Sequence, residues 1–289
     1  MSNQSQVTEF ILQGLLEAPH LQVLFFVLCL SLYTMALCGN SLIVVAISCS
    51  SGLHTPLYLF LVSLLVLDVI CACPVVPKLL EILMAEKRGI SYRGCMAQMY
   101  FLSWSVAGET LLLTAMAYKH YVAMCRPLHY GSTTGPWVCA VLTGAVWGTS
   151  MLGAGVNTCL MLRLTFCGPD VDEPSFFVAD VLFAMLKLLL TVASHGCIVA
   201  SILGIHMAEG KQRVFSTCWS HLLVVTVNYS TVIHTYVSPG SSYSPGVGKA
   251  MAVLYSSVSP TSNPLIYTLR KKDVKAALRN VFTLWAGKL

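Results

Sequence analysis

The sequence has few charged residues: only 10% of its 289 positions are Asp, Glu, Lys or Arg, whereas 56% are hydrophobic. A soluble globular domain carries about 25% charged residues, so this composition excludes a surface that is mostly in contact with water. The mean hydropathy of +0.74 agrees with that conclusion. We therefore expect most of the surface to face lipid, as in a multi-pass membrane protein.

Several functional signatures are also missing. The 12 cysteines lie mostly inside apolar runs, and Cys71 and Cys73 have no second pair at zinc-binding spacing. The Lys and Arg residues form no basic stripe, so no nucleic-acid partner is expected. The sequence has no nucleophile motif, metal cluster or phosphate loop, as an intramembrane enzyme would need, and no internal repeat of the kind transporters have. We expect neither an enzyme nor a bound organic cofactor.

The first 20 or so residues are not typical of a cleaved signal peptide. They include Glu9 and Glu17 and lack both a basic segment and a small-residue cleavage site. We expect the first apolar run to act as an uncleaved signal anchor. Asn3 begins an Asn-Gln-Ser glycosylation sequon, which can be used only outside the membrane.

Seven apolar runs are long enough to cross a membrane, which needs about 20 residues each. Because backbone polar groups must be satisfied within lipid, these runs are predicted to be helices. The predicted fold class is an all-α membrane protein, a seven-transmembrane helix bundle in one domain over residues 1–289. The expected divisions are an outer N-terminus at 1–21, a bundle at 22–269 and an inner tail at 270–289. The seven spans are centred near Met35, Leu67, Leu111, Val146, Leu190, Val225 and Ser257.

Positive charge predicts the orientation of the bundle. Lys and Arg are most concentrated after the seventh span, which favours an extracellular N-terminus and a cytoplasmic C-terminus in the plasma membrane. In this tail, Lys272 to Leu284 is predicted to form an amphipathic helix that contacts lipid through Val274, Ala277 and Leu278. The alternative is a solvated basic tail.

Short motifs carry a family resemblance. Met116 to Cys125 reads Met-Ala-Tyr-Lys-His-Tyr-Val-Ala-Met-Cys at the inner end of the third span. Together with five other motifs, in order and spacing, it resembles the odorant (olfactory) receptors among the rhodopsin-like (class A) G-protein-coupled receptors. The resemblance implies a plasma-membrane receptor that binds small volatile odorants and activates a stimulatory, olfactory-type G protein, raising cyclic AMP. The other motifs are Gly39-Asn40, Leu53 to Tyr58, Leu67-Asp68, Phe215 to Leu222 and Pro260 to Arg270.

Two features depart from the family pattern. The family usually has Asp-Arg where this chain has Lys119-His120, and its second outer loop is usually longer than the stretch that follows Cys167. Histidine is shorter than arginine and only partly charged near neutral pH, so we expect weak G-protein coupling. The alternative functions are a receptor-like protein with weak or no signalling, and a small-molecule transporter. The resemblance assigns the G-protein switch to Lys119, His120, Tyr121, Asn263, Pro264 and Tyr267, although the Asn-Pro kink could be purely structural.

Cys95 and Cys167 are the clearest cysteines in the expected outer loops. The resemblance implies a disulfide between them, which would hold the second outer loop to the top of the third span. The alternative is two free thiols.

Two acids, Asp68 and Glu109, are placed in the middle of the second and third spans. A charge at that depth costs about 3 kcal/mol, so both are expected to face each other inside the bundle. A sodium ion or a shared proton would relieve their repulsion. The resemblance favours a sodium site, with Asn40 and Asn263 nearby; the alternative is two neutral, hydrogen-bonded carboxyl groups without an ion.

The resemblance also places the odorant pocket among the outer halves of the third, fifth, sixth and seventh spans. An apolar lining with a few hydroxyl groups suits small volatile molecules. Ordinary helix packing is the alternative for each position, and Lys187, within the fifth span, is left without a role. The predicted lining residues are Ser103, Val106, Ala107, Tyr229, Val232, Ile233 and Tyr236.

Overall fold

The described part of the protein is almost entirely helical. The computed structural model describes residues 9–11, 19–84, 89–125, 135–167, 260–264, 266 and 272–286, and positions 189, 193, 196 and 200. A 3-10 turn at Ser51–Leu53 joins the first two helices. The helices are α1 (Pro19–Cys49), α2 (Pro56–Met84), α3 (Tyr92–Cys125), α5 (Pro136–Cys167) and α9 (Lys272–Ala286), and the strands are β1 (Glu9–Ile11) and β2 (Gly89–Ser91).

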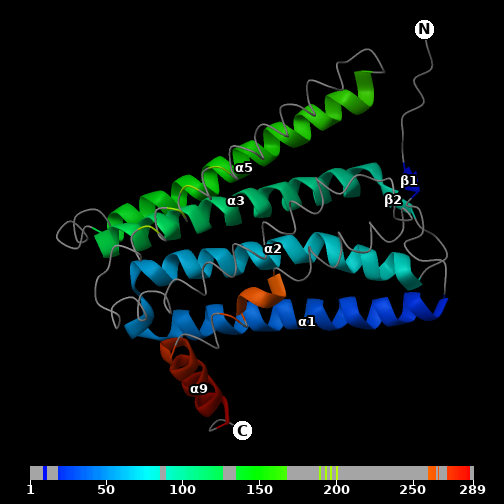
Figure 1. The fold of residues 1–289 in the computed structure, drawn as a ribbon. Coiled ribbons are helices and arrows are strands. Elements are labelled where there is room, and N and C mark those ends of the chain that lie inside the picture. The colour runs from blue at the N-terminus through cyan, green and yellow to red at the C-terminus, as the bar shows by residue number, and fades with distance from the viewer. Residues whose placement is uncertain are drawn as a thin grey trace.

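The four long helices lie side by side in chain order, α1 against α2, α2 against α3 and α3 against α5 (Figure 1). Successive helices run in opposite directions, so α1 and α3 begin at the end of the bundle where the strands lie. The short helical segment 260–264, orange in Figure 1, lies between α1 and α2. α9 leaves the bundle at the opposite end, beside the end of α1.

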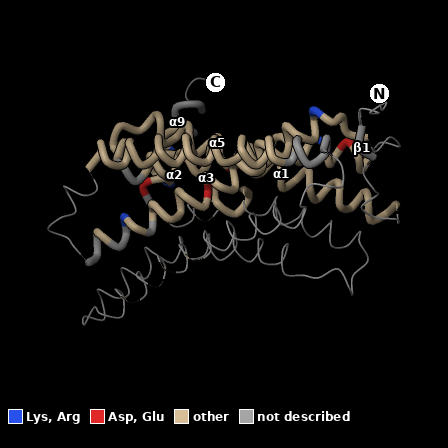
Figure 2. Tube along the Cα trace, turned by 90° about the horizontal axis from the view of Figure 1, so that it is seen from above, with Lys and Arg blue, Asp and Glu red and all other residues tan. Residues whose placement is uncertain are grey.

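Apolar composition explains why these helices form a membrane bundle. Among the described residues, three helical stretches are long and apolar enough to cross a membrane: Pro19–Cys49, Tyr58–Met84 and Pro136–Leu160. Figure 2 shows how few charged positions the described helices carry. Three helices begin at a proline, which has the fixed backbone angle of a first helical turn and lacks only an N–H that would be unpaired there.

The predicted spans can be compared with these helices. The centres expected near Met35, Leu67, Leu111 and Val146 lie in α1, α2, α3 and α5, so a helix is present at each of the first four. The centres near Leu190, Val225 and Ser257 lie outside the described residues. α1 begins at Pro19, slightly before the boundary expected at residue 22.

The centre of the described core is the first half of α2. Its large apolar side chains are almost completely shielded and pack against α1 and α3. Gly108 of α3 permits this close approach, because a Cβ atom there would lie 2.7 Å from Cδ1 of Leu67. The most completely buried residues of α2 are Phe60, Leu61, Leu64, Leu65 and Leu67.

The termini add one unexpected and one expected element. β1 pairs antiparallel with β2, with Phe10 opposite Ile90, which attaches the N-terminal segment to the connection between α2 and α3. The sequence did not predict this sheet. α9 confirms the amphipathic helix, since Val274 and Ala277 are buried whereas Lys275 and Arg279 are exposed.

Candidate functional site

A buried acid lies at the middle of the bundle. Asp68 of α2 is completely shielded from solvent. The Nδ2 atom of Asn263 donates to both of its carboxylate oxygens, at 2.9 Å and 2.9 Å. This pair of hydrogen bonds joins α2 to the segment 260–264.

Glu109 of α3 belongs to the same cluster. It is 5% exposed, and its carboxyl group interacts directly with that of Asp68. Ser105, one turn earlier on α3, is also buried, and its hydroxyl group donates to the carbonyl oxygen of Leu102 at 3.0 Å. The acids therefore lie inside the bundle and face each other, as expected from the cost of exposing them to lipid.

The Gly39-Asn40 motif connects α1 to this cluster. Nδ2 of Asn40 donates to the carbonyl oxygens of Ala36 at 2.8 Å and Pro260 at 2.9 Å. A Cβ atom on Gly39 would lie 3.2 Å from Cβ and Cγ of Pro264, so glycine lets α1 approach the proline ring. The motif thus has a physical role: the glycine provides space and the asparagine provides the interhelical bond.

The oxygen atoms of this cluster suit a hard cation. Oδ1 of Asn40 and Oδ1 of Asn263 are buried and have no hydrogen-bond partner among the described residues. Together with the carboxyl groups of Asp68 and Glu109, they form the oxygen-rich set of ligands that hard cations prefer. The residues therefore fit a sodium ion, and sodium binding stays a prediction. In the described ranges, no three His, Cys, Asp or Glu side chains gather as a metal site.

Lys119 occupies an unusual place near the end of α3. Its side chain is buried, with 5% exposed. Its Nζ atom donates to Sγ of Cys139 of α5 at 3.8 Å and lies 5.7 Å from the ring centre of Phe60 of α2. No carboxylate forms an ion pair with it in the part of the chain that the structure describes. Lys119 is thus a contact among three helices, a role that sequence reasoning missed because it considered only the loss of the acid.

The other switch residues are only partly described. Asn263 and Pro264 lie in the segment beside α1 and α2. The side chains of His120 and Tyr121 and all of Tyr267 lie outside the described residues. Tyr58 adds a contact at the same end of the bundle as Lys119, since its hydroxyl group donates to Oδ2 of Asp273 of α9 at 3.4 Å.

The predicted odorant pocket is also only partly described. Ser103 and Ala107 of α3 are half-buried, and Val106 is 39% exposed. The structure does not bring these three into either of the two cavities described for it. The remaining predicted lining residues, the glycosylation site and the fifth-span lysine lie outside the described residues: Tyr229, Val232, Ile233, Tyr236, Asn3 and Lys187.

The two cysteines expected in outer loops are placed differently. Cys95 lies within α3, which begins at Tyr92, and Cys167 is the last residue of α5, because both helices extend beyond the expected spans. Cys95 is a free thiol among the described residues, and the side chain of Cys167 lies outside them. α5 separates from α3 toward its C-terminal end (Figure 1). Pairing in an oxidising compartment stays a prediction.

Comparisons with known proteins agree with the motifs. The family model described as "Olfactory receptor" matches residues 28–185 and 175–284. Olfactory receptor 13A1 of Homo sapiens is 47% identical over 98% of this chain and 92% of its own length. Olfactory receptor 13G1 of Homo sapiens is 40% identical over 97% and 98%, and olfactory receptor 8G50 of Mus musculus is 38% identical over 97% and 97%. Matches that cover nearly the whole chain at these identities show that it belongs to the olfactory receptor family, and is therefore a multi-pass, seven-transmembrane G-protein-coupled receptor and not an enzyme.

Proposed function

We propose that this receptor binds small volatile odorants within the outer half of its bundle and activates a stimulatory, olfactory-type G protein inside the cell, raising cyclic AMP. The N-terminus would be extracellular and the C-terminus cytoplasmic in the plasma membrane. Family membership and the concentration of Lys and Arg after the seventh span support this assignment.

The observation that carries the proposal is the continuity of α3. This one helix holds the predicted odorant contacts Ser103 and Ala107, then Glu109 in the buried cluster, then Lys119 at its other end. The cluster joins α3 to α2, α1 and the segment 260–264 through buried bonds. A ligand that prefers one arrangement of these elements would shift the population at the inner end of α3.

A sodium ion is proposed as a structural partner of the same cluster. Asp68 and Glu109 would supply carboxylate oxygens, and Asn40 and Asn263 the two buried amide oxygens. The bound ion would supply a positive charge that balances the two acids. Its test is the thermal stability of the purified receptor in sodium buffer against an equal concentration of a large organic cation. Sodium should raise the unfolding temperature of the native chain but not of Asp68→Asn; equal temperatures for the native chain would remove sodium from the proposal.

A second candidate function is a receptor with weak or no signalling. The observation that favours it is Lys119, because a buried cation now stands where the family has an acid. Lysine at position 119 is not equivalent to the acid usual in the family, and histidine at position 120 is not equivalent to the usual arginine.

The test of the leading proposal is a cyclic-AMP assay in cells that express the full chain, using a panel of volatile odorants. Once an odorant is found, Ala107→Leu should reduce its potency by about tenfold or more, since the added side chain enters the predicted pocket. Ala145→Leu is the matched control, because it makes the same change at an exposed position of α5. Surface expression must be equal in all chains.

Two results would contradict the proposal in different ways. In the first, the native receptor is well expressed but responds to no odorant, whereas the Lys119→Asp, His120→Arg double mutant responds. That result would favour the weak-signalling alternative. Equal potency in Ala107→Leu and Ala145→Leu would instead show that the odorant pocket does not include this part of α3.

A further inference from the structure

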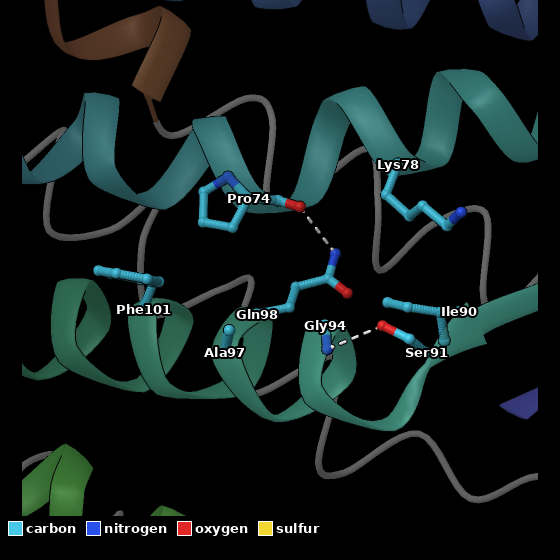
Figure 3. A pocket seen from close by; sticks show the side chains of 8 residues that line it. All are labelled: Pro74, Lys78, Ile90, Ser91, Gly94, Ala97, Gln98 and Phe101. Carbon is cyan, nitrogen blue, oxygen red and sulfur yellow. Dashed lines mark hydrogen bonds between the residues drawn. The ribbon is translucent and has the colours of Figure 1, made fainter. Parts of the chain in front are cut away.

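A cavity of about 330 Å³ lies between α2 and α3, at the end of the bundle opposite Lys119. Figure 3 shows its walls: Pro74 and Lys78 project from α2, Ile90 comes from β2, and Gln98 and Phe101 project from α3. The α2 residues are one helical turn apart, and so are neighbouring α3 residues, so the cavity runs along the facing sides of two helices.

Hydrogen bonds keep these walls in place. Nε2 of Gln98 donates to the carbonyl oxygen of Pro74 at 3.1 Å, which joins α3 to α2 across the cavity (Figure 3). Oγ of Ser91 accepts the backbone N–H of Gly94 at 3.2 Å, which fixes β2 to the first turn of α3. Backbone pairing with β1 also holds β2 in position. Hydrogen bonds therefore hold together the elements that line this space.

The cavity combines an apolar wall with one positively charged side chain. Pro74, Ile90 and Phe101 provide apolar surface, and Lys78 is the charged residue among those that line the cavity. The Lys78 ammonium group bonds to Oε1 of Glu81 at 2.8 Å, with side chains 23% and 59% exposed. An exposed ion pair of this kind contributes little to stability, so the ammonium group can turn to another carboxylate at little cost.

We propose that this cavity is a second ligand site, which binds a small carboxylate with a short apolar chain. The carboxylate accepts hydrogen bonds from the Lys78 ammonium group, and the chain lies against Ile90 and Phe101. The volume is at the lower end of the range of about 300–1,000 Å³ found for small-molecule sites, which fits a molecule of octanoate size. The site is separate from the odorant pocket expected around Ser103 and Ala107 and does not depend on G-protein coupling.

The experiment measures occupancy and not signalling. Ala97 lines the cavity and is exposed, so Ala97→Cys places a reporter thiol there. Its rate of modification by a membrane-impermeant methanethiosulfonate is measured on the full receptor, with the parent chain as background. Octanoate should slow the reaction, and octanol, which has the same chain length without the charge, should protect much less.

Charge recognition is tested by changing Lys78 in the Ala97→Cys receptor. Lys78→Met should raise the octanoate concentration needed for half-protection by about tenfold or more, since a bond to a charged group is lost. Lys78→Arg should keep the protection. Met84→Cys, at the exposed end of α2 and outside the cavity, is the control thiol and should react at the same rate with or without octanoate.

Either of two results would overturn the proposal. One is no protection by octanoate up to its solubility limit in the Ala97→Cys receptor. The other is equal protection in the Lys78→Met and Lys78→Arg forms, which would show that the ammonium group does not recognise the carboxylate. A receptor that passes this test but fails the odorant assay would separate the second site from the proposed function.

Discussion

The acid at mid-bundle and the lysine near the end of α3 are both buried, but their surroundings differ. Asp68 receives two hydrogen bonds from Asn263 and lies beside Glu109, so amide and carboxyl groups surround it. Lys119 has a thiol at 3.8 Å and an aromatic ring at 5.7 Å as its described neighbours. A thiol is a weak acceptor, and a ring face attracts a cation by about 0.5–2 kcal/mol.

This difference separates two kinds of buried charge. Around Asp68, each helix contributes a polar group that can form a hydrogen bond with a group on another element, so the cluster joins elements that are distant in the chain. Around Lys119, the charge contacts groups that would pack equally well against an apolar side chain. The first site should therefore be sensitive to the loss of one partner, and the second should tolerate or even favour removal of its charge.

The largest effect is expected for Asn263→Leu. The substitution removes both hydrogen bonds that the Asn263 amide group donates to the buried Asp68 carboxyl group, and loss of a buried hydrogen-bond partner costs about 1–3 kcal/mol. The receptor should lose most of its surface expression and unfold at a lower temperature. Surface labelling and thermal unfolding of the solubilised protein measure the two effects.

An exchange variant is the control for that change. Asp68→Asn combined with Asn263→Asp keeps one carboxyl and one amide group at the same contact, so it should recover part of the stability lost in Asn263→Leu. If Asn263→Leu unfolds at the temperature of the native chain, the bond between α2 and the segment 260–264 does not stabilise the bundle.

The second effect concerns signalling. Lys119→Asp with His120→Arg should increase the odorant-stimulated cyclic-AMP response several-fold at matched surface expression, because arginine supplies a permanently charged fork of five donors that imidazole cannot copy. Lys119→Asp alone should not, since it places an acid beside Cys139 and Phe60 without the adjacent arginine. Equal responses of the native and double-mutant chains would show that this receptor couples without the usual pair.

The two regions also show how far the sequence predicts the structure. The sequence predicts that Asp68 and Glu109 lie inside the bundle because a carboxyl group in an apolar run has few other acceptable places, and the family resemblance places Asn40 near them. The position of Lys119 could not be derived, because its burial depends on the approach of Phe60 and Cys139 from two other helices. The sequence shows that a lysine occupies this position but not which groups its side chain contacts.

Contacts between distant segments were missed for the same reason. β1 and β2 have three residues each, which is too few for an alternating pattern. In the sequence, the two long helices α1 and α2 separate them. The cavity beside Lys78 depends on the facing sides of α2 and α3. Helix periodicity predicts that helices exist, but the rotation of each helix and the extension of α3 to include Cys95 depend on packing.

A smaller effect is expected for Lys119→Met. Methionine keeps the length of the apolar stem beside Phe60 and removes a charge that has no described carboxylate partner. The free energy of unfolding should rise by about 1 kcal/mol, in line with other replacements of buried charges by apolar groups. Lys119→Ala is the control, because it also removes the stem and should lower stability. A loss of stability in the methionine form, measured by thermal unfolding, would mean that the cation itself holds α3 to α2 and α5.

The smallest effect is expected for Tyr58→Phe, which tests a contact at the same end of the bundle as Lys119. The Tyr58 hydroxyl group donates to Oδ2 of Asp273 at 3.4 Å, which is long for a hydrogen bond, and Asp273 is exposed. The net contribution should therefore be about 0.5 kcal/mol, at the low end for a bond to a charged group. Global unfolding should barely change, because Val274 and Ala277 still bury the apolar face of α9. Hydrogen exchange should become faster in the first turn of α9 but not in α2, and Val274→Ser, which attacks the apolar contact, should accelerate exchange throughout α9. If Tyr58→Phe loosens the whole of α9 as much as Val274→Ser does, the polar contact and not the apolar face fixes this helix to the bundle.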